Sequence, residues 1–254
     1  MRLKVLILLL GLAIGLALGD AFFSSSKGSL GRPGGPFGKI RTDLDRYAPK
    51  IFSEANEEVI IRHFFADRRN GFFLDVGAYH YKDKSNTYYL EKNLGWQGIA
   101  VDANDEFEQG YADNRPKTRF FAFFVSDRSD ERVDFYIVRD PGHLTKSTAV
   151  PSFIEGRKSE KREVPTIKLD DLLAKLGVSK IDFFNLDIEL WEPQALAGFD
   201  IERYRPSLVC IEAHPPVRQR IIEYFADHGY RRLDQYLLFD RRNWYFAPDT
   251  AQDE

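Results

Sequence analysis

The chain has 254 residues, which is enough for one sizeable α/β domain with its own hydrophobic core. Its formal net charge of -3 at pH 7 is nearly balanced and excludes the basic excess that is typical of a nucleic-acid-binding domain. Cys210 is its single cysteine, so no intrachain disulfide is possible and cysteine usage indicates no zinc site.

The N-terminal residues 1–23 form an apolar stretch after a basic start. Arg2 and Lys4 precede the stretch, and Asp20 lies near its end. A cleaved signal peptide begins in this way, whereas a membrane anchor needs about 20 apolar residues. Lys and Arg are slightly more numerous after the stretch than before it, which favours an anchor with the folded domain in the cytoplasm. Export by a signal peptide is the alternative.

Residues 24–45 follow, and their first part (SSSKGSLGRPGGPFG) is rich in Gly, Ser and Pro. We interpret residues 24–45 as a linker that is flexible in its Gly-rich part and residues 46–254 as the single folded domain. Residues 53–68 carry apolar side chains at a helical period, with acids in the first turns. They predict a helix that covers one face of a sheet.

The next segment has the order strand, glycine turn, helix, strand, acid. The apolar run 72–76 ends at Gly77, a helix is predicted over 85–94, and a second strand at 98–101 ends on Asp102. This order is typical of the first half of a nucleotide-binding α/β fold. The acid follows the glycine by some 25 residues, close to the spacing of roughly 20 at which such folds bind a ribose diol. An α/β unit without a ligand is the alternative, because the turn has a single glycine.

The remaining elements continue the alternation of strands and helices. A helix is predicted within 105–114, strands at 119–125, 133–138, 181–186 and 207–211, a strand leading into a helix over 164–173, a helix at 218–228 and a terminal hairpin over 230–246. The polar stretch 146–163 is predicted to be an irregular loop that forms part of a substrate lid.

Several blocks of the sequence, taken in order, resemble one enzyme family. They are Asp75-Val76-Gly77-Ala78, Ser85-Asn86-Thr87, Gly95-Trp96-Gln97-Gly98 and Asp102-Ala103-Asn104, followed by 164–173 and 181–198. They resemble the FkbM-type methyltransferases, which are S-adenosylmethionine-dependent and typically O-methylate sugars or natural products. The resemblance implies an α/β fold with a doubly wound, mostly parallel seven-stranded sheet of the Rossmann-like kind and an antiparallel C-terminal strand. It also implies S-adenosyl-L-methionine as the cofactor and a small-molecule or glycan acceptor.

Two positions depart from the family pattern. The family has Asp-Val-Glu-Gly where this chain has Asp187-Ile188-Glu189-Leu190, so a bulky side chain replaces a glycine near the acceptor pocket. Tyr79 and His80 stand where Asn and Gly are frequent, and an aromatic ring there either stacks on the ligand or fills part of its space. A binding or scaffold protein without catalysis is therefore one alternative, and a nicotinamide-dependent oxidoreductase is another.

The site is expected at one edge of the sheet, because ligands of open α/β sheets bind outside the carboxyl ends of the strands. Asp102 is assigned to the ribose, and residues 124–127, with Ser126 and Asp127, are a candidate contact of the adenine ring, for which a structural turn is the alternative. The full set of predicted cofactor-binding residues is Asp75, Gly77, Ala78, Asn86, Thr87, Asp102, Ala103, Ser126, Asp127 and Asp187. Acids after strands often cap the next helix instead.

Methyl transfer needs two oriented reactants and a group that takes the proton of the acceptor hydroxyl. His214, Asp187 and Glu189 are the predicted catalytic residues, and His80 is a further candidate for the base. Asp187, Glu189, Glu212 and His214 also have the ligand types of a divalent metal site. No spacing rule supports such a site, so the sequence assigns no metal.

Overall fold

The computed structural model describes residues 36–141 and 146–249. The chain divides into two compact units, with the boundary between Arg46 and Tyr47. In the first unit the described residues include helix α2 (Pro36–Asp45), which occupies the last part of the predicted linker. The predicted anchor, residues 1–23, lies outside the described residues. Within the described ranges, every helix is too short or too polar to cross a lipid bilayer.

The second unit is built on a seven-stranded sheet with the order β3-β2-β1-β7-β8-β10-β9. Strands β3, β2, β1, β7 and β8 pair in parallel, and β10 runs antiparallel to both β8 and β9. The predicted mostly parallel seven-stranded sheet with an antiparallel C-terminal strand is confirmed. The strands are β1 (Phe72–Val76), β2 (Gln97–Asp102), β3 (Thr118–Ala122), β7 (Phe183–Leu186), β8 (Leu208–Glu212), β9 (Tyr230–Arg232) and β10 (Asn243–Pro248).

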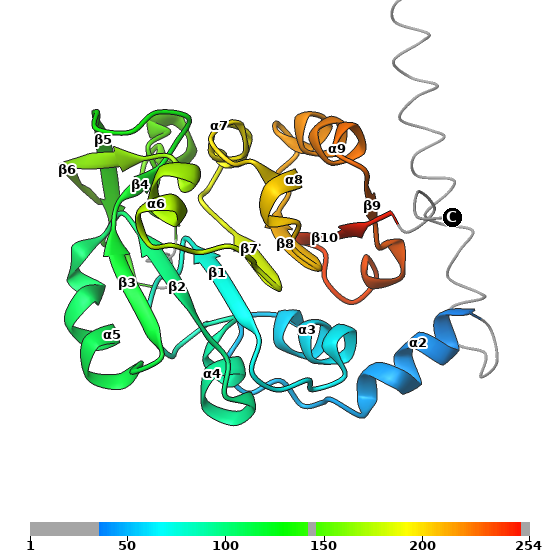
Figure 1. The fold of residues 1–254 in the computed structure, drawn as a ribbon. Coiled ribbons are helices and arrows are strands. Elements are labelled where there is room, and N and C mark those ends of the chain that lie inside the picture. The colour runs from blue at the N-terminus through cyan, green and yellow to red at the C-terminus, as the bar shows by residue number, and fades with distance from the viewer. Residues whose placement is uncertain (1–35, 142–145, 250–254) are drawn as a thin grey trace, which may run out of the picture. The chain divides into compact units, whose positions relative to one another are not determined.

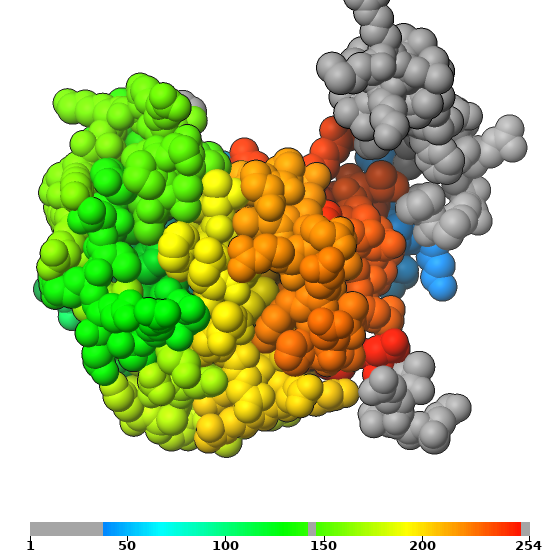
Figure 2. Space-filling model, turned by 90° about the horizontal axis from the view of Figure 1, so that it is seen from above, coloured from blue at the N-terminus to red at the C-terminus, as the bar shows by residue number. Residues whose placement is uncertain are grey.

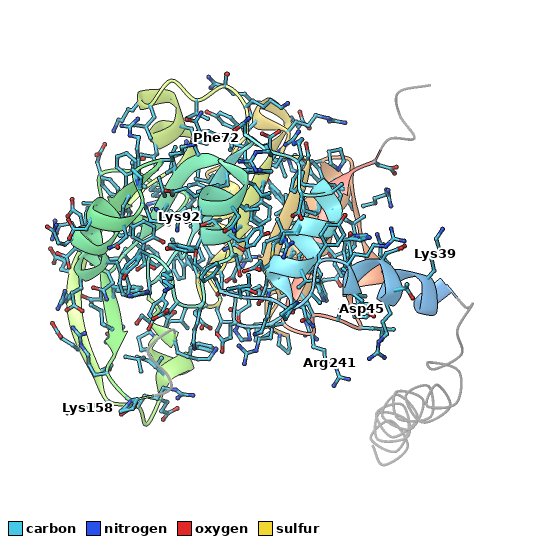
Figure 3. The ribbon with its side chains drawn as sticks, turned by 90° about the horizontal axis from the view of Figure 1, so that it is seen from below. Lys39, Asp45, Phe72, Lys92, Lys158 and Arg241 are labelled. Atoms are coloured by element: carbon cyan, nitrogen blue, oxygen red, sulfur yellow. The ribbon has the colours of Figure 1, made fainter. Side chains whose placement is uncertain are left out.

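Helices cover both faces of this sheet, as the doubly wound prediction requires (Figure 1). One side carries α3 (Glu57–Phe65), α4 (Tyr88–Leu94) and α5 (Glu108–Asn114). The other carries α6 (Leu169–Lys175), α7 (Glu192–Ala197), α8 (Ile201–Tyr204) and α9 (Arg218–Asp227). Figure 2 shows the molecule from the side of α7 and α9, and Figure 3 from the opposite side, where Lys92 of α4 lies in front of the sheet. Short 3-10 helices are η2 (Asp105–Phe107), η4 (Pro151–Ile154) and η5 (Asp234–Tyr236).

Strand side chains alternate between the two faces, and the two faces differ in chemistry. Leu74 and Val76 of β1 pack in the main core with apolar side chains of α6, α7, α8 and α9. The opposite face carries a row of register partners, Asp75 on β1, Asn185 on β7 and Cys210 on β8. All three are buried. The sheet therefore has polar groups in its interior, on the side of α3 and α4.

Two expectations about the segment after β3 are wrong. The predicted strand 119–125 ends at Ala122, and residues 124–125 form a separate strand, β4 (Phe124–Val125), in a three-stranded sheet. The predicted loop 146–163 is a strand from residue 159 on. It is β6 (Ser159–Ile167), which pairs with β5 (Arg132–Val138) and β4 in that sheet. The end of this hairpin, where Lys158 lies, extends beyond the seven-stranded sheet (Figure 3).

The fully buried Arg115 ties together the elements on the polar side of the sheet. Its Nε donates to Glu91 Oε2 at 2.6 Å, and its Nη2 donates to Thr118 Oγ1 at 3.1 Å and to Thr87 Oγ1 at 3.3 Å. Thr87 in turn donates to Asp75 Oδ2 at 2.7 Å. A buried ion pair is stable only when its remaining polar atoms are bonded, and this network provides those bonds.

The variant Arg115→Ala removes the buried partner of Glu91 and leaves it only the partly exposed Lys92, whose Nζ lies 3.7 Å from Glu91 Oε1. We expect it to lower the free energy of unfolding by about 3–5 kcal/mol. Arg128→Ala is the control, because the Arg128–Glu131 pair is exposed, and its effect should stay below about 1 kcal/mol. Urea denaturation measures both variants. Equal effects of the two substitutions would show that the buried pair does not stabilise the domain.

Candidate active site

A largely apolar cleft lies at the carboxyl ends of β1, β2 and β7. Its empty volume is about 530 Å³, including its opening. We call it the apolar cleft. It is lined by Val76, Gly77, Tyr79, Val101, Asp102, Ala103, Asn104, Phe107, Phe123, Phe124, Val125, Phe135, Ser147, Asp187, Ile188 and Glu189.

A second cleft, with an empty volume of about 670 Å³, adjoins the first and is lined mostly by polar and charged side chains. We call it the polar cleft. Its lining residues are Glu54, Glu57, Asp75, Gly77, Ala78, Tyr79, Lys84, Asn86, Lys146, Asn185, Asp187, Glu189, Glu212, Arg242 and Asn243. Gly77, Tyr79, Asp187 and Glu189 line both clefts. The two clefts therefore meet at the turn after β1 and at the end of β7.

Gly77 is required at this junction for two reasons. Its φ is +77°, a conformation that side-chain-bearing residues rarely adopt. A Cβ at this position would lie 1.7 Å from the carbonyl oxygen of Asp187. The turn is held in place on both sides, because Gly77 N donates to Val101 O at 2.9 Å and Asp187 N donates to Val76 O at 3.0 Å.

Asp102 lies at the end of β2, where the fold predicts a ribose-binding acid. Its Oδ2 accepts the backbone N–H of Tyr79 at 2.9 Å, and its Oδ1 accepts that of Asn104 at 2.8 Å. Burial raises the pKa of Asp102 to about 6, although these two hydrogen bonds oppose the shift. Each carboxylate oxygen has a second lone pair, so the group retains acceptor capacity toward the apolar cleft.

Three of the predicted cofactor residues, Asp75, Asn86 and Thr87, belong to one hydrogen-bond network at the polar cleft, in which Asn185 joins Asn86 to Asp75. Asn185 Nδ2 donates to Asp75 Oδ1 at 2.9 Å, and Asn86 Nδ2 donates to Asn185 Oδ1 at 3.1 Å. Thr87 Oγ1 occupies the other oxygen of Asp75. Burial raises the pKa of Asp75, and the hydrogen bonds from Thr87 and Asn185 oppose it. Asp75 and Thr87 thus position the turn, while Asn86 and Asn185 reach the cleft lining.

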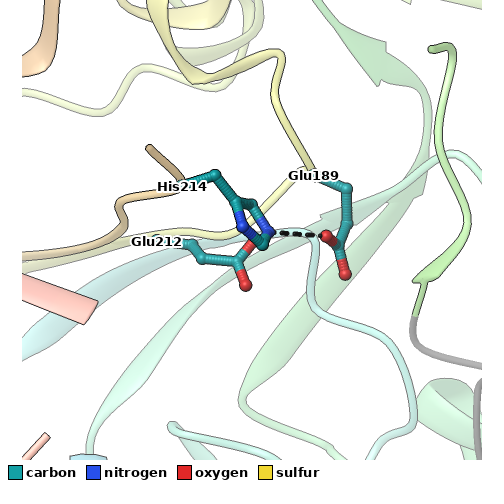
Figure 4. Close-up of side chains that lie close together, drawn as sticks. All are labelled: Glu189, Glu212 and His214. Carbon is teal, nitrogen blue, oxygen red and sulfur yellow. Dashed lines mark hydrogen bonds and ion pairs between the residues drawn. The ribbon is translucent and has the colours of Figure 1, made fainter. Parts of the chain in front are cut away.

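Four titratable side chains meet at the ends of β7 and β8 (Figure 4). His214 Nε2 lies 3.0 Å from Glu189 Oε2 and 3.0 Å from Glu212 Oε2. Lys146 Nζ donates to the other oxygen of Glu189 at 3.0 Å, and Thr148 Oγ1 donates to the backbone carbonyl of Glu189 at 2.9 Å. Glu189 and Glu212 are buried and His214 is half-buried.

The titratable groups at the ends of β7 and β8, including Asp187, differ in their pKa values. Burial, reinforced by Glu212 and Glu189, raises the pKa of Asp187 well above its usual range. Burial alone would raise the pKa of Glu212, but His214, Asp187 and Lys146 lower it below the usual value. The neighbouring carboxylates, Glu189 and then Glu212, raise the pKa of His214 to about 9. At neutral pH Glu212 is therefore ionised, and His214 carries a proton between two carboxyl groups.

Leu190 replaces the glycine of the family pattern, but its backbone keeps a conformation that is typical of glycine. Glu189 and Leu190 have φ values of +53° and +81°, so both occupy the left-handed region. The family's glycine adopts such angles readily, whereas a leucine stores strain there. Leu190 packs against the main core, which offsets part of this strain.

The structure brings most predicted site residues to the two clefts. Gly77, Ala78, Asn86, Asp102, Ala103, Asp187 and Glu189 line one or both, and Asp75 lines the polar cleft from below. His214 joins them through Glu189 and Glu212. Their roles remain predictions. Ser126 and Asp127 line neither cleft, because Ser126 Oγ bonds to Asp127 and to Trp191 Nε1.

Sequence reasoning missed several lining residues. Phe107 and Phe123 line the apolar cleft, and an aromatic excess was the only signal that could have pointed to them. Asn185 lies inside an apolar run, where an amide needs a buried partner, and that exception was a usable signal. Lys146 reaches Glu189 from a distant loop, and no local pattern predicts this contact.

The sheet order and the clefts at the strand ends define a Rossmann-like methyltransferase fold. Residues 75–232 match the family model of the methyltransferase FkbM domain. The chain therefore belongs to the FkbM methyltransferase family, whose methyl donor is S-adenosylmethionine.

Similar solved structures include a TehB-like SAM-dependent methyltransferase from Corynebacterium glutamicum, with a TM-score of 0.43 and 12% identity, covering 84% of this chain and 96% of that one. Another is a precorrin-6y C5,15-methyltransferase from Geobacter metallireducens, with a TM-score of 0.42 and 13% identity, covering 80% and 93% respectively. A search of curated proteins gave no match.

Substituting Gly77 should have a larger effect than φ alone explains. Gly77→Ala adds a methyl group 1.7 Å from the Asp187 carbonyl and should cost several times the ~1 kcal/mol of a left-handed alanine. Gly156→Ala is the matched control, since Gly156 has a φ of +78° but no atom within 4 Å of the added Cβ. Thermal denaturation compares them. A Gly77 variant no less stable than the control would contradict the close approach.

Proposed function

We propose that this chain transfers the methyl group of S-adenosylmethionine to a hydroxyl of a sugar or a related polyhydroxylated metabolite. The observation that carries the proposal is the junction of an apolar and a polar cleft at Gly77, Asp187 and Glu189. An in-line displacement needs a nucleoside sulfonium on one side of such a junction and an acceptor on the other.

The residues of the apolar cleft fit the adenosyl part of the cofactor. Phe107, Phe123 and Phe124 offer aromatic surface for a purine ring, and Asp102 offers a carboxylate for the ribose diol. The glycine turn lets the backbone approach the ligand without a Cβ in the way. S-adenosylmethionine supplies an electrophilic methyl group when bound, and the protein has to hold and orient it.

The polar cleft supports the acceptor assignment. Its lining includes Glu54, Asn86, Asn185, Arg242 and Asn243, a set of donors and acceptors that suits several hydroxyl groups. An apolar acceptor would displace water from these polar groups without forming hydrogen bonds in return, which disfavours its binding. A sugar or a comparable metabolite therefore fits this lining better.

The same junction also contains groups that can take the proton of the acceptor hydroxyl. Glu189 lines both clefts and lies 3.0 Å from His214 Nε2, so the two side chains form a pair that can accept and hold a proton. We assign this pair to the base function. Asp187 lines both clefts beside this pair, and burial raises its pKa well above the usual range.

Calorimetry with S-adenosylmethionine, S-adenosylhomocysteine and NAD tests the cofactor assignment. The full-length chain should bind the first two and release little heat with NAD. Binding of NAD alone would contradict the proposal and favour an oxidoreductase, and no binding of any of the three would favour a scaffold protein. Release of S-adenosylhomocysteine in the presence of glycan or sugar extracts then tests the acceptor class.

Asp102 gives a prediction about pH. Its carboxylate accepts ribose hydroxyls best when ionised, so cofactor affinity should fall as the pH falls through about 6. Asp102→Asn should weaken binding by about 1–3 kcal/mol at neutral pH and flatten this dependence. Asp75 and Asp187 are retained in the variant, so the difference from the wild type reports Asp102 itself.

Asp127→Asn is the matched control for this experiment, because Asp127 is exposed and lines neither cleft. It should keep both the affinity and the pH dependence of the wild type. Unchanged affinity of Asp102→Asn in calorimetry would remove the ribose assignment.

A further inference from the structure

Three side chains at the ends of β7 and β8 present their ligand atoms to a common point. The atoms of Glu189, Glu212 and His214 lie within 4.8 Å of one another. Glu189 follows β7 and, like the next residue Leu190, has a left-handed backbone conformation, while Glu212 ends β8 and His214 follows it. Figure 4 shows the imidazole between the two carboxyl groups. The backbone thus holds all three near one position.

This arrangement has more acceptors than donors. The His214 Nε2 hydrogen bond goes to Glu189 Oε2, and a single N–H cannot also serve the second carboxylate. Glu212 Oε2 lies 3.0 Å from the same nitrogen, yet it is buried and accepts no hydrogen bond from the described residues. A buried carboxylate oxygen without a donor is costly, and a cation from solution would remove that cost.

The spacing matches the edge of a metal coordination shell. Ligand atoms about 2.0–2.2 Å from an ion lie about 3.0 Å apart at the right angles of an octahedral shell, and about 3.4 Å apart in the tetrahedral shell of zinc. The two separations from His214 Nε2 are both 3.0 Å. A displacement of the shared proton by an ion would therefore require little movement of the three side chains.

We infer that Glu189, Glu212 and His214 form a binding site for a divalent transition-metal ion. One imidazole and two carboxylates are ligands that Mn²⁺, Fe²⁺ and Zn²⁺ accept. Lys146 pairs with Glu189 Oε1 and leaves Oε2 to the ion. The charges of a divalent ion, the lysine, the two carboxylates and a neutral imidazole add up to one positive charge. A bound alkoxide or hydroxide neutralises this charge.

The place of the site gives the ion a role, and this role rests on the proposed function. Glu189 lines both clefts and Glu212 lines the polar cleft, so the ion faces the position of the acceptor. A metal ion lowers the pKa of a hydroxyl or water bound to it and orients that group. It would thus orient the acceptor oxygen for methyl transfer, and because Glu189 and His214 would then be ligands of the ion, the hydroxyl proton would leave to solvent.

The experiment measures Mn²⁺ binding directly. The full-length chain, purified in mild detergent and freed of metal by a chelator, is titrated with MnCl₂ while electron paramagnetic resonance records the free ion. We expect one ion bound per chain. In the same samples, proton NMR should show Mn²⁺ broadening the His214 ring signals before those of the other histidines.

Isosteric variants locate the ion. Glu189→Gln and Glu212→Gln should each weaken Mn²⁺ binding at least about tenfold, since losing an outer-shell partner alone costs roughly 10–100-fold. Glu202→Gln, an exposed acid on α8, is the control and should bind like the wild type. No ion on the wild type would overturn the inference. So would equal binding by the wild type and both site variants, or broadening that spares His214.

Calorimetry with S-adenosylmethionine on the same metal-free protein separates this inference from the proposed function. Cofactor binding without Mn²⁺ binding rejects the metal site alone. Mn²⁺ binding without cofactor binding rejects the proposed function and leaves the metal site standing.

Discussion

The close approach between the turn after β1 and the end of β7 is the constraint on which the candidate site depends. Because Gly77 has no side chain, its backbone passes directly against the carbonyl oxygen of Asp187. The neighbouring strands can then end at the same depth, and Val76 O accepts the N–H of Asp187. Both clefts take part of their lining from these two residues, so a change at either one affects the space for both reactants.

Several acidic side chains lie at this edge of the sheet, and their surroundings shift their pKa values in different ways. Glu192 stays largely neutral at neutral pH, since burial raises its pKa to about 8, and burial raises the pKa of Asp187 well above its usual range. Glu189 and Glu212 keep cationic neighbours in Lys146 and His214. The site therefore has a small net charge, and its carboxyl and imidazole groups can exchange protons, which suits the transfer of a proton from a substrate.

The sequence predicted the parts of the fold that follow from local patterns. The strands β1, β2, β7 and β8 are apolar runs that end in an acid or a glycine, and the structure contains each of them within two residues of the expected ends. The end of β6 was predicted as the strand that leads into a helix over 164–173, but its first half escaped prediction because it is polar and exposed and depends on pairing with β5 rather than on burial. The break at Phe123 escaped for a related reason, since residues 119–125 read as one continuous apolar run.

For the site, the strand ends were predictable and the contacts between them were not. The convergence of Asp102, Asp187 and Glu189 follows from the geometry of parallel strands. Thr87 donates its hydrogen bond to Asp75 instead of to a ligand. This contact lies in the interior on the polar side of the sheet, and the spacing of residues in the sequence does not predict it. The assignment of Ser126 and Asp127 did not lead to a cleft because β4 leaves the main sheet before them.

The buried Cys210 makes the central sheet accessible to a simple chemical measurement. It lies on β8 beside Asn185 and Tyr245, fully enclosed, and burial raises the pKa of its thiol well above the usual range. A thiol in this state is inert toward alkylating reagents until the strands separate. Since the chain has no other cysteine, the rate of its modification reports the opening of the sheet itself, without a label or an engineered residue.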